Sequence, residues 1–277
     1  MTVSVILPTF NVERWIAEQL AALADQICSC EWELVIADNG STDDTRTIAL
    51  GFKPRFGRFK LVDASGVRGP AHARNQGVRT ASGELLLFTD ADDIVRQGWI
   101  AHLTDGLRDF PLVTGPVEHF EYEGVRPRGG HQLLPRPPGA PLSRVIGGNM
   151  GTTRELFFEL GGFDETLQFG WSDFDFAVRA DLRGTPIGWE EQAVVQRRRP
   201  TSVQRMWNKE FVYGRGWTTL ERRYPHLSPR GWRPLLRRAG WIAVRTPYIA
   251  FPDRRRGWVM KAAQLAGRVV ERLRPST

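Results

Sequence analysis

Short apolar runs alternate with amphipathic segments along the first part of the chain. The run from Val3 to Thr9 is followed by apolar residues at helical spacing between Val12 and Ile27, and this succession repeats three more times before residue 111. A short continuous apolar run predicts a buried strand, and a 3.6-residue repeat predicts a helix. Strands are predicted at 3–9, 33–38, 59–63, 85–89 and 112–114, and helices at 12–27, 41–50, 70–81, 99–110, 153–160 and 173–183. This order predicts an α/β fold with a mostly parallel, Rossmann-like sheet flanked by helices.

The fourth apolar run ends abruptly in three carboxylates, Asp90, Asp92 and Asp93. Open α/β sheets keep their ligands at the carboxyl ends of the strands. In an extended segment, Asp-x-Asp spacing places two side chains on one side, where their oxygens converge on a divalent cation. The alternative is an Asp-rich turn that caps the next helix, because Asp is common in turns and caps.

The chain has 277 residues, enough for one large α/β domain or a domain with an appendage. Residues 124–141 are rich in Gly and Pro and predict a loop over the site.

Cys28 and Cys30 are too few for a disulfide framework or a four-ligand zinc site, so we expect a reducing cytoplasm. Residues 1–7 lack the basic start of a signal peptide, and no apolar run is long enough to span a bilayer.

Charge is distributed unevenly along the chain. The net charge is +7, but residues 197–277 alone carry 20 Lys and Arg against 4 Asp and Glu. A basic tail on an acidic body indicates contact with an anionic surface. Apolar residues between Trp258 and Leu273 form one helical stripe with cations around it, as in helices that lie at a membrane interface. A helix packed on the body with a solvated basic face remains the alternative.

Five short motifs occur in a fixed order. They are Val5-Ile6-Leu7-Pro8-Thr9-Phe10-Asn11, Ala37-Asp38-Asn39-Gly40-Ser41, Ala73-Arg74-Asn75-Gln76-Gly77, Asp90-Ala91-Asp92-Asp93, and Gly161-Gly162-Phe163-Asp164-Glu165 followed by Ser172-Asp173. Together they resemble family-2 glycosyltransferases of the GT-A fold. The resemblance implies a catalytic domain over 1–215, with a nucleotide-sugar half at 1–115 and an acceptor half at 116–215. Residues 216–277 would then form a basic helical extension.

The resemblance also implies a nucleoside-diphosphate sugar as donor. Pro8, Thr9 and Asn11 would lie near the nucleoside, and Asp38 would accept a hydrogen bond from the base. Arg74 would lie beside the nucleotide, where a guanidinium suits phosphate or base. From the residues alone, Asp38 equally suits a turn that leads into the next helix, and Arg74 equally suits a surface salt bridge.

Three acids receive chemical roles from the same resemblance. Asp90 would lie near the ribose and Asp92 would bind Mg²⁺ or Mn²⁺, which stabilises the diphosphate as it leaves. Asp173 would act as general base on the acceptor hydroxyl, so that displacement inverts the anomeric configuration. On the residues alone, a helix cap is the alternative for Asp173, as it is for Asp93.

The chain departs from the family pattern at two places. The residue before Asp173 is usually Glu and is Ser172 here, and a His ligand near the end of the catalytic domain is replaced by Arg in the segment 195–199. Either Asp92 holds the metal with diphosphate and water, or Arg side chains neutralise part of the charge. Whether the metal is strictly required therefore stays open.

The sequence thus predicts an inverting, hexosyltransferase-like enzyme of cell-envelope polysaccharide, glycolipid or natural-product glycosylation. Its acceptor would be a glycan, a lipid-linked sugar or a small molecule, and it would act in the cytoplasm or peripherally at the inner face of the cell membrane. Two alternatives are a Mg²⁺-dependent phosphatase or nucleotidyltransferase, and a non-enzymatic basic binder of membrane or nucleic acid. No nucleic-acid-binding module is recognisable, so we expect no nucleic-acid partner.

Overall fold

The computed structural model describes residues 1–121, 145–167, 170–199, 202–225 and 233–274. The loop predicted at 124–141 lies outside them. Contacts divide the chain into two compact units, Met1–Thr166 with Ser172–Arg199 and Leu167–Trp171 with Pro200–Thr277. The domain boundary predicted at 215/216 falls inside helix α7 (Val203–Arg223), so the predicted extents of the catalytic domain and the extension stay predictions.

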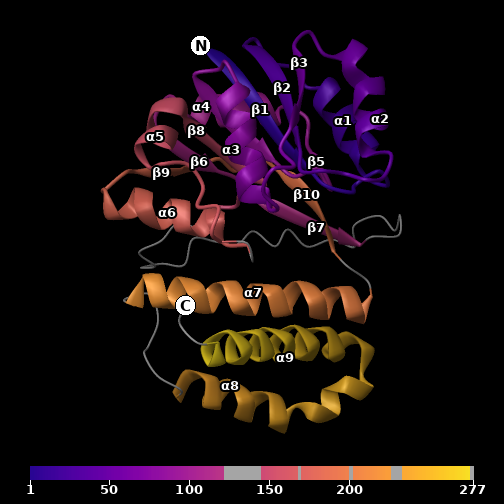
Figure 1. Cartoon of the computed structure of the whole chain (residues 1–277), viewed down its shortest axis with the longest axis vertical. Coiled ribbons are helices and arrows are strands. Elements are labelled where there is room, and N and C mark those ends of the chain that lie inside the picture. The colour runs from indigo at the N-terminus through magenta and orange to yellow at the C-terminus, as the bar shows by residue number, and fades with distance from the viewer. Residues whose placement is uncertain (122–144, 168–169, 200–201, 226–232, 275–277) are drawn as a thin grey trace. The chain divides into compact units, whose positions relative to one another are not determined.

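The described part of the first unit contains a seven-stranded sheet in the order β3-β2-β1-β4-β8-β6-β9 (Figure 1). The strands are β1 (Thr2–Thr9), β2 (Glu31–Asp38), β3 (Phe59–Asp63), β4 (Leu85–Thr89), β6 (Leu112–Thr114), β8 (Asn149–Thr153) and β9 (Ile187–Trp189). Strands β1 to β4 are parallel to one another, whereas β8 runs antiparallel to β4 and β6. The predicted α/β fold with a mostly parallel sheet is confirmed.

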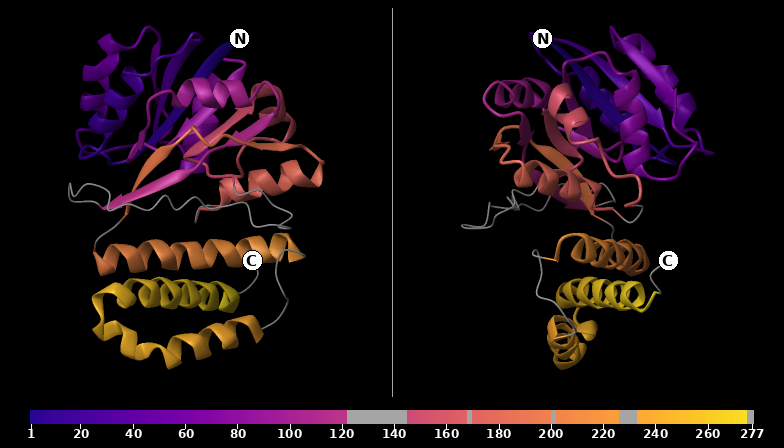
Figure 2. Two further views of the ribbon diagram at one scale, coloured as in Figure 1. Left: turned by 180° about the vertical axis from the view of Figure 1, so that it is seen from behind. Right: turned by 60° about the vertical axis from the view of Figure 1, so that its left-hand side comes forward.

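A smaller sheet extends from the carboxyl end of β4 (Figure 2). It contains β5 (Asp93–Val95), β10 (Val195–Arg199) and β7 (Val117–Glu121), with β10 in the middle. Strands β5 and β10 are antiparallel, and their register sets Arg197 opposite Asp93. The acidic run therefore continues directly into a strand rather than into a helix.

Helices cover both faces of the large sheet. They are α1 (Ile16–Ala24), α2 (Thr45–Phe52) with the 3₁₀ turn η1 (Lys53–Arg55), α3 (Pro70–Thr80), α4 (Trp99–Gly106), α5 (Arg154–Glu159) and α6 (Ser172–Leu182). Each predicted helix is present with shifted ends. The first begins late because the Val12 amide donates to the Thr45 hydroxyl at 2.8 Å, which holds the chain in a turn.

Alternate residues of the central strands pack into two separate cores. Val5 and Leu7 of β1 join α1 and α4 in one core, whereas Ile6 joins α3, α5 and α6 in the other. A strand that is apolar at every position is the pattern of a sheet buried on both faces. Helix α3 lies so close to β1 that a Cβ on Gly77 would come within 2.7 Å of Ile6 Cγ2.

The second unit is helical. It contains α7, α8 (Arg233–Val244), the 3₁₀ turn η3 (Thr246–Ala250) and α9 (Pro252–Leu273). Within the described residues, no helix is both long enough and apolar enough to cross a membrane. In the first unit, Cys28 and Cys30 form a disulfide, a local link that joins no separate elements.

Candidate functional site

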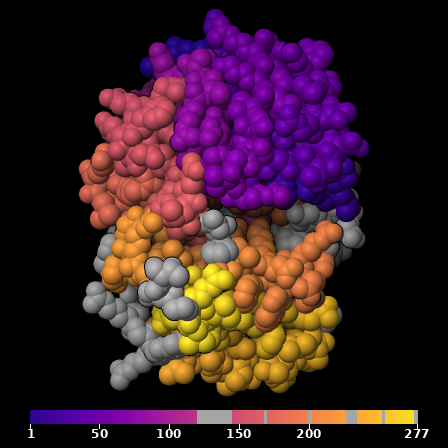
Figure 3. Space-filling view, viewed as in Figure 1, coloured from indigo at the N-terminus to yellow at the C-terminus, as the bar shows by residue number. Residues whose placement is uncertain are grey.

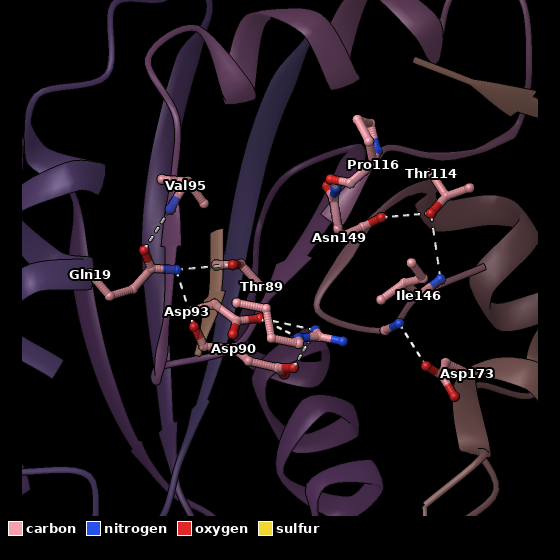
Figure 4. Close-up of polar contacts among 12 residues, drawn as sticks. Gln19, Thr89, Asp90, Asp93, Val95, Thr114, Pro116, Ile146, Asn149 and Asp173 are labelled. Carbon is pink, nitrogen blue, oxygen red and sulfur yellow. Dashed lines mark hydrogen bonds and ion pairs between the residues drawn. The ribbon is translucent and has the colours of Figure 1, made fainter. Parts of the chain in front are cut away.

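The acidic run at the end of β4 is held by two arginines from distant parts of the chain. Arg74 of α3 donates from Nη2 to Asp90 Oδ1 at 2.5 Å. Arg197 of β10 donates from Nη2 to Asp90 Oδ2 at 3.2 Å and from Nε to Asp93 Oδ2 at 3.0 Å (Figure 4). One guanidinium thus bridges two carboxylates, the forked geometry that arginine favours.

Asp93 is the buried member of this group. Burial, as the largest cause, raises the pKa of its carboxyl to about 7; the positive charge of Arg197 opposes the rise, and the negative charges of Asp92 and Asp90 add to it. Like charges at close range disfavour ionisation, and so does loss of solvent. Three carboxylates at the carboxyl end of β4 thus lie close to two arginine side chains, and the buried one, Asp93, holds its proton more readily than a free carboxyl does.

A buried glutamine of α1 fixes the backbone around the acids. Gln19 Nε2 donates to Thr89 Oγ1 at 2.9 Å and to the Asp90 carbonyl at 3.1 Å, and its Oε1 accepts from the Val95 amide at 3.0 Å (Figure 4). Gln19 is fully excluded from solvent. This one side chain ties the end of β4 to β5 on both sides of the acidic turn.

The turn before β8 connects the acids with Asp173. The Gly147 amide donates to Asp173 Oδ2 at 2.7 Å. A Cβ on the neighbouring Gly148 would lie 2.3 Å from Asp90 Oδ2 and 2.5 Å from Arg197 Nη2. A side chain there would displace the Asp90–Arg197 pair, so consecutive residues of one turn lie against the predicted base and the predicted ribose-side acid.

Asn149 anchors that turn. Its Oδ1 accepts from Trp99 Nε1 at 2.8 Å, and its Nδ2 donates to the carbonyls of Pro116 and Ala193 at 2.9 and 2.7 Å. The Thr114 hydroxyl donates to the Asn149 carbonyl at 2.8 Å (Figure 4). Because all these groups are buried, the turn is held from several elements at once.

A pocket of about 320 Å³ opens at the carboxyl ends of β1 and β4. Its lining includes three of the predicted donor-site residues, the predicted metal ligand and the loop before α3. The lining residues are Pro8, Thr9, Phe10, Val12, Asn39, Arg68, Gly69, Pro70, Ala73, Asp90, Ala91 and Asp92. Arg68 lies over the Phe10 ring at 4.1 Å, which adds a cation and an aromatic face to the pocket.

Asp38 is fully buried, and each of its carboxylate oxygens accepts two hydrogen bonds. Oδ1 accepts from Thr9 Oγ1 at 3.0 Å and from Ser41 Oγ at 2.5 Å, whereas Oδ2 accepts from the Ser41 amide and from Arg46 Nη1, both at 3.1 Å. These contacts match the turn-stabilising alternative. A contact with the base of a nucleotide stays a prediction for this residue.

Asn11 has a comparable local role. It adopts a left-handed backbone conformation with φ of 50°, and its Oδ1 accepts from the Thr42 amide at 2.8 Å. The loops after β1 and β2 are thereby tied together. Asn11 is not part of the pocket lining, and its predicted nucleoside contact stays a prediction.

The residues present fit a divalent cation only in part. Within the described ranges, no group of three or more His, Cys, Asp and Glu side chains is arranged to hold a metal ion. Asp92 offers carboxylate oxygens at the pocket wall, the ligand type that Mg²⁺ and Mn²⁺ take. Asp90 and Asp93 are already paired with arginines, so a bound cation would need oxygens from the donor diphosphate and water.

Three residues of this site were not predicted individually: Arg197, Gln19 and Asn149. A usable signal existed for Gln19, because it is a polar residue on the otherwise apolar stripe of α1. The contact between Arg197 and Asp93 joins residues 104 positions apart, and the sequence indicates only an Arg-rich segment there.

The glycosyl transferase family 2 model matches residues 4–161 of this chain. The chain belongs to glycosyl transferase family 2. The matched region contains every predicted donor-site and metal-site residue, whereas Asp173 lies beyond it. Family membership supports the transferase prediction over the phosphatase and non-enzymatic alternatives.

Curated relatives in the family share a limited segment with the chain. A UDP-Glc:alpha-D-GlcNAc-diphosphoundecaprenol beta-1,3-glucosyltransferase, WfgD of Escherichia coli, is 37% identical over 100 residues, covering 36% of this chain and 37% of the relative. A PGL/p-HBAD biosynthesis glycosyltransferase of Mycobacterium bovis is 41% identical over 90 residues, covering 32% and 35%. The similarity thus spans about a third of each relative's length.

Solved structures share the fold across nearly the whole chain. Mannosyltransferase PcManGT from Pyrobaculum calidifontis, in complex with GDP-Man and Mn²⁺, superimposes with a TM-score of 0.72 at 21% identity, covering 98% of this chain and 87% of that one. TarS 1-349 of S. aureus, in complex with UDP-GlcNAc, has a TM-score of 0.59 at 20% identity, covering 98% and 91%. At these identities the likeness establishes the GT-A-like fold.

Proposed function

We propose that this family 2 chain transfers a sugar, with inversion, from a nucleoside-diphosphate sugar to an acceptor hydroxyl. The observation that carries the proposal is the Gly147–Gly148 turn, which contacts Asp173 on one side and Asp90 on the other. A general base and a donor-binding carboxylate are thereby held by one short segment at the carboxyl end of β4. The pocket lined by Pro8, Thr9 and Asp92 would take the nucleotide.

In the proposed reaction Asp173 accepts the proton of the acceptor hydroxyl. The acceptor oxygen forms a bond to the anomeric carbon, and the bond from that carbon to the diphosphate oxygen breaks. The electron pair leaves with the nucleoside diphosphate, and attack opposite the leaving group inverts the configuration. The Gly147 amide, by donating to Asp173 Oδ2, fixes the direction of this carboxylate.

Asp92 would hold Mg²⁺ or Mn²⁺ together with diphosphate oxygens. When bound, the cation would neutralise charge on the leaving diphosphate. Arg74 and Arg197 hold Asp90 and Asp93, so that the aspartates around Asp92 do not repel the diphosphate with their full charge. Pro8, Thr9, Asn11, Asp38, Arg74 and Asp90 are the proposed donor-binding residues.

The acceptor class is proposed from the relatives. One relative is named for a diphosphoundecaprenol-linked sugar, and another for PGL/p-HBAD biosynthesis. We therefore favour a lipid-linked or glycan acceptor in cell-envelope assembly over a small molecule. The proposed location is the cytoplasm, with the acceptor reached at the inner face of the cell membrane.

Calorimetric titration of UDP, dTDP and GDP in Mn²⁺, Mg²⁺ or EDTA tests the donor site. We expect one nucleotide to bind in a metal-dependent way, and Asp92→Ala to abolish the metal dependence. Asp181→Ala, an exposed acid on α6, is the matched control and should bind as the unchanged chain does. If none of the three nucleotides bound, the proposal would be contradicted. If a nucleotide bound equally well without metal, the role of Asp92 would be contradicted.

A further inference from the structure

An exposed apolar face runs along α8 in the second unit. Leu236 and Val244 are 66% and 77% exposed, and Gly240 and Ala243 between them are also exposed. These positions are spaced i, i+4, i+7 and i+8, which places them on one side of a helix. The apolar exposure continues after the helix at Ile249 and Phe251, and Phe251 is 57% exposed.

This face is not the one that α8 uses to pack within its unit. Leu235 is buried, and the Ile242 carbonyl accepts from Trp258 Nε1 of α9 at 3.0 Å. In both ribbon views α8 lies on the opposite side of α9 from α7 (Figures 1 and 2). The space-filling view shows α8 and η3, in gold, at the surface of the second unit (Figure 3).

Helix α9, whose sequence also predicts an interfacial stripe, is instead largely occupied by packing against α7. Val259, Ala263 and Gly267 are buried along one side of it. A Cβ on Gly267 would lie 2.0 Å from the Phe211 carbonyl oxygen of α7, so the two backbones nearly touch. Membrane contact along the middle of α9 would require these helices to separate, and the face on α8 requires no such change.

Positive charge surrounds the exposed face. Residues 233–261 contain eight Lys and Arg and one acidic residue, Asp253. Arg237, Arg254 and Arg255 are exposed. An apolar face flanked by arginines is the composition of helices that lie in the interface of an anionic bilayer.

Aromatic side chains lie among these cations. Lys261 Nζ is 3.7 Å and Arg245 Cζ is 4.5 Å from the Trp241 ring centroid, and Arg254 lies over the Tyr248 ring at 5.0 Å. Trp and Tyr favour the headgroup level of membranes because their rings are amphipathic.

We propose that α8, η3 and the first turn of α9 form a membrane-binding surface that inserts Leu236, Val244 and Phe251 among the headgroups of an anionic bilayer. A nucleic acid would match the cations but would leave these apolar side chains exposed to water. An anionic bilayer attracts the cations and also removes the apolar side chains from water. The proposal concerns the second unit alone and does not depend on the reaction proposed for the first.

Vesicle flotation of the full chain tests the surface. The vesicles are phosphatidylcholine alone or mixed with phosphatidylglycerol. We expect binding to the anionic vesicles only. Val244→Asp with Phe251→Asp removes two apolar contacts and should lower the partition coefficient by at least about tenfold, because burial of apolar surface favours binding. Phe251 precedes α9 as its cap, where Asp is well tolerated.

A charge variant and a matched control complete the design. Arg254→Glu with Arg255→Glu should also lower binding to anionic vesicles by at least about tenfold, because two cations that attract the anionic headgroups become repelling anions. Leu182→Asp with Arg183→Glu, an exposed apolar–basic pair at the last residue of α6 and in the turn after it, should bind as the unchanged chain does. Circular dichroism and nucleotide binding of every variant report whether both units remain folded.

Three results would overturn the proposal. The first is failure of the unchanged chain to bind any vesicle. The second is full binding by the Val244→Asp, Phe251→Asp variant, which would indicate a purely electrostatic contact. The third is equal loss in the α6 control. A shift in oligomeric state caused by the apolar variant, with vesicle binding unchanged, would instead assign the face to a second copy of the chain. If the unchanged chain bound vesicles but no nucleotide, the result would count against the proposed function only.

Discussion

Two buried carboxylates, Glu33 and Asp93, lie near opposite ends of the sheet in the first unit and have opposite environments. At the amino end, Glu33 is 2% exposed and accepts from Ser4 Oγ at 2.7 Å, from the Ser82 amide at 2.5 Å and from Lys60 Nζ at 2.7 Å. Burial alone raises the pKa of Glu33, but the hydrogen bonds from Lys60, Ser4 and Ser82 outweigh it and lower the pKa to about 2.

At the carboxyl end, Asp93 is equally buried but lies beside two other carboxylates. Burial and the charges of Asp92 and Asp90 raise its pKa to about 7 despite Arg197. Glu33 has donors for its charge and is complete as it stands. The acidic turn gathers three carboxylates around two arginines, and a carboxyl with such a perturbed pKa is typical of functional sites.

Pocket size alone would have selected the wrong end of the sheet. The larger hollow, about 660 Å³, is beside Glu33 and is lined by Lys53, Arg58 and Lys60 among others. The pocket at Asp90 and Asp92 is about 320 Å³. We place the site at the smaller pocket, because its carboxylates are crowded and the family motifs converge there.

The largest expected effect is at the carboxyl end, in Asp173→Asn. Turnover should fall by about 10² to 10⁴, because the variant removes a positioned general base. Donor affinity should stay near that of the unchanged chain, since Asp173 is not part of the nucleotide pocket. Initial rates with a lipid-linked acceptor, together with calorimetry of the nucleotide, measure both quantities.

A turnover loss below threefold would contradict the role of Asp173. Asp175→Asn, two residues along the same helix, is a stability comparison, because Asp175 is buried and paired with Arg179 at 2.7 Å. It should lower the melting temperature, whereas Asp173→Asn should not.

At the amino end of the sheet we expect the opposite result, because a change at Glu33 should lower stability and leave activity unchanged. Glu33→Ala should lower the free energy of unfolding by about 3 kcal/mol, because it leaves buried donors without their acceptor. Urea unfolding measures this difference. Nucleotide affinity should be unchanged in the folded variant.

Glu31→Ala is the matched control on the same strand. Its side chain is 75% exposed and pairs with Arg58 at 3.1 Å, so its loss should cost less than about 1 kcal/mol. Equal destabilisation by the two variants would show that the buried hydrogen bonds of Glu33 contribute nothing beyond a surface pair.

Acid unfolding sharpens the same contrast. Because the pKa of Glu33 falls from 4.5 to about 2 on folding, its contribution is fully present above pH 4.5 and is lost as the pH falls toward 2. The difference amounts to about 3 kcal/mol. Urea unfolding at several pH values should therefore show a flatter pH dependence between 4.5 and 2 in Glu33→Gln.

The stability of that variant should still depend on pH to some extent, because Glu165 also has a lowered pKa. Burial raises the pKa of Glu165, but the hydrogen bonds from Asn75 and His72 outweigh burial. Glu31→Gln should keep the full slope. An unchanged slope in Glu33→Gln would contradict the low pKa.

The sequence predicted the parallel half of the sheet well, because β1 to β4 are short apolar runs with local signals at both ends. It missed β5, β7, β8, β9 and β10, whose segments are short or polar and become strands through distant partners. Asn149 and Gln19 show why the site was harder. Each satisfies several buried groups from different elements, and no local pattern encodes those partners.

The smallest predicted effect concerns Arg197, the cation that limits the crowding at Asp93. Arg197→Ala should lower the free energy of unfolding by about 1 to 3 kcal/mol, because two carboxylates lose a shared charged donor. Arg197→Lys should recover only part of the loss, since an ammonium cannot fork between Asp90 and Asp93 as a guanidinium does. Arg183→Ala, in the exposed turn after α6, is the control and should change little. If Arg197→Ala were as stable as this control, the acidic turn would not need its arginine, and the contrast with the saturated carboxylate of Glu33 would lose its physical basis.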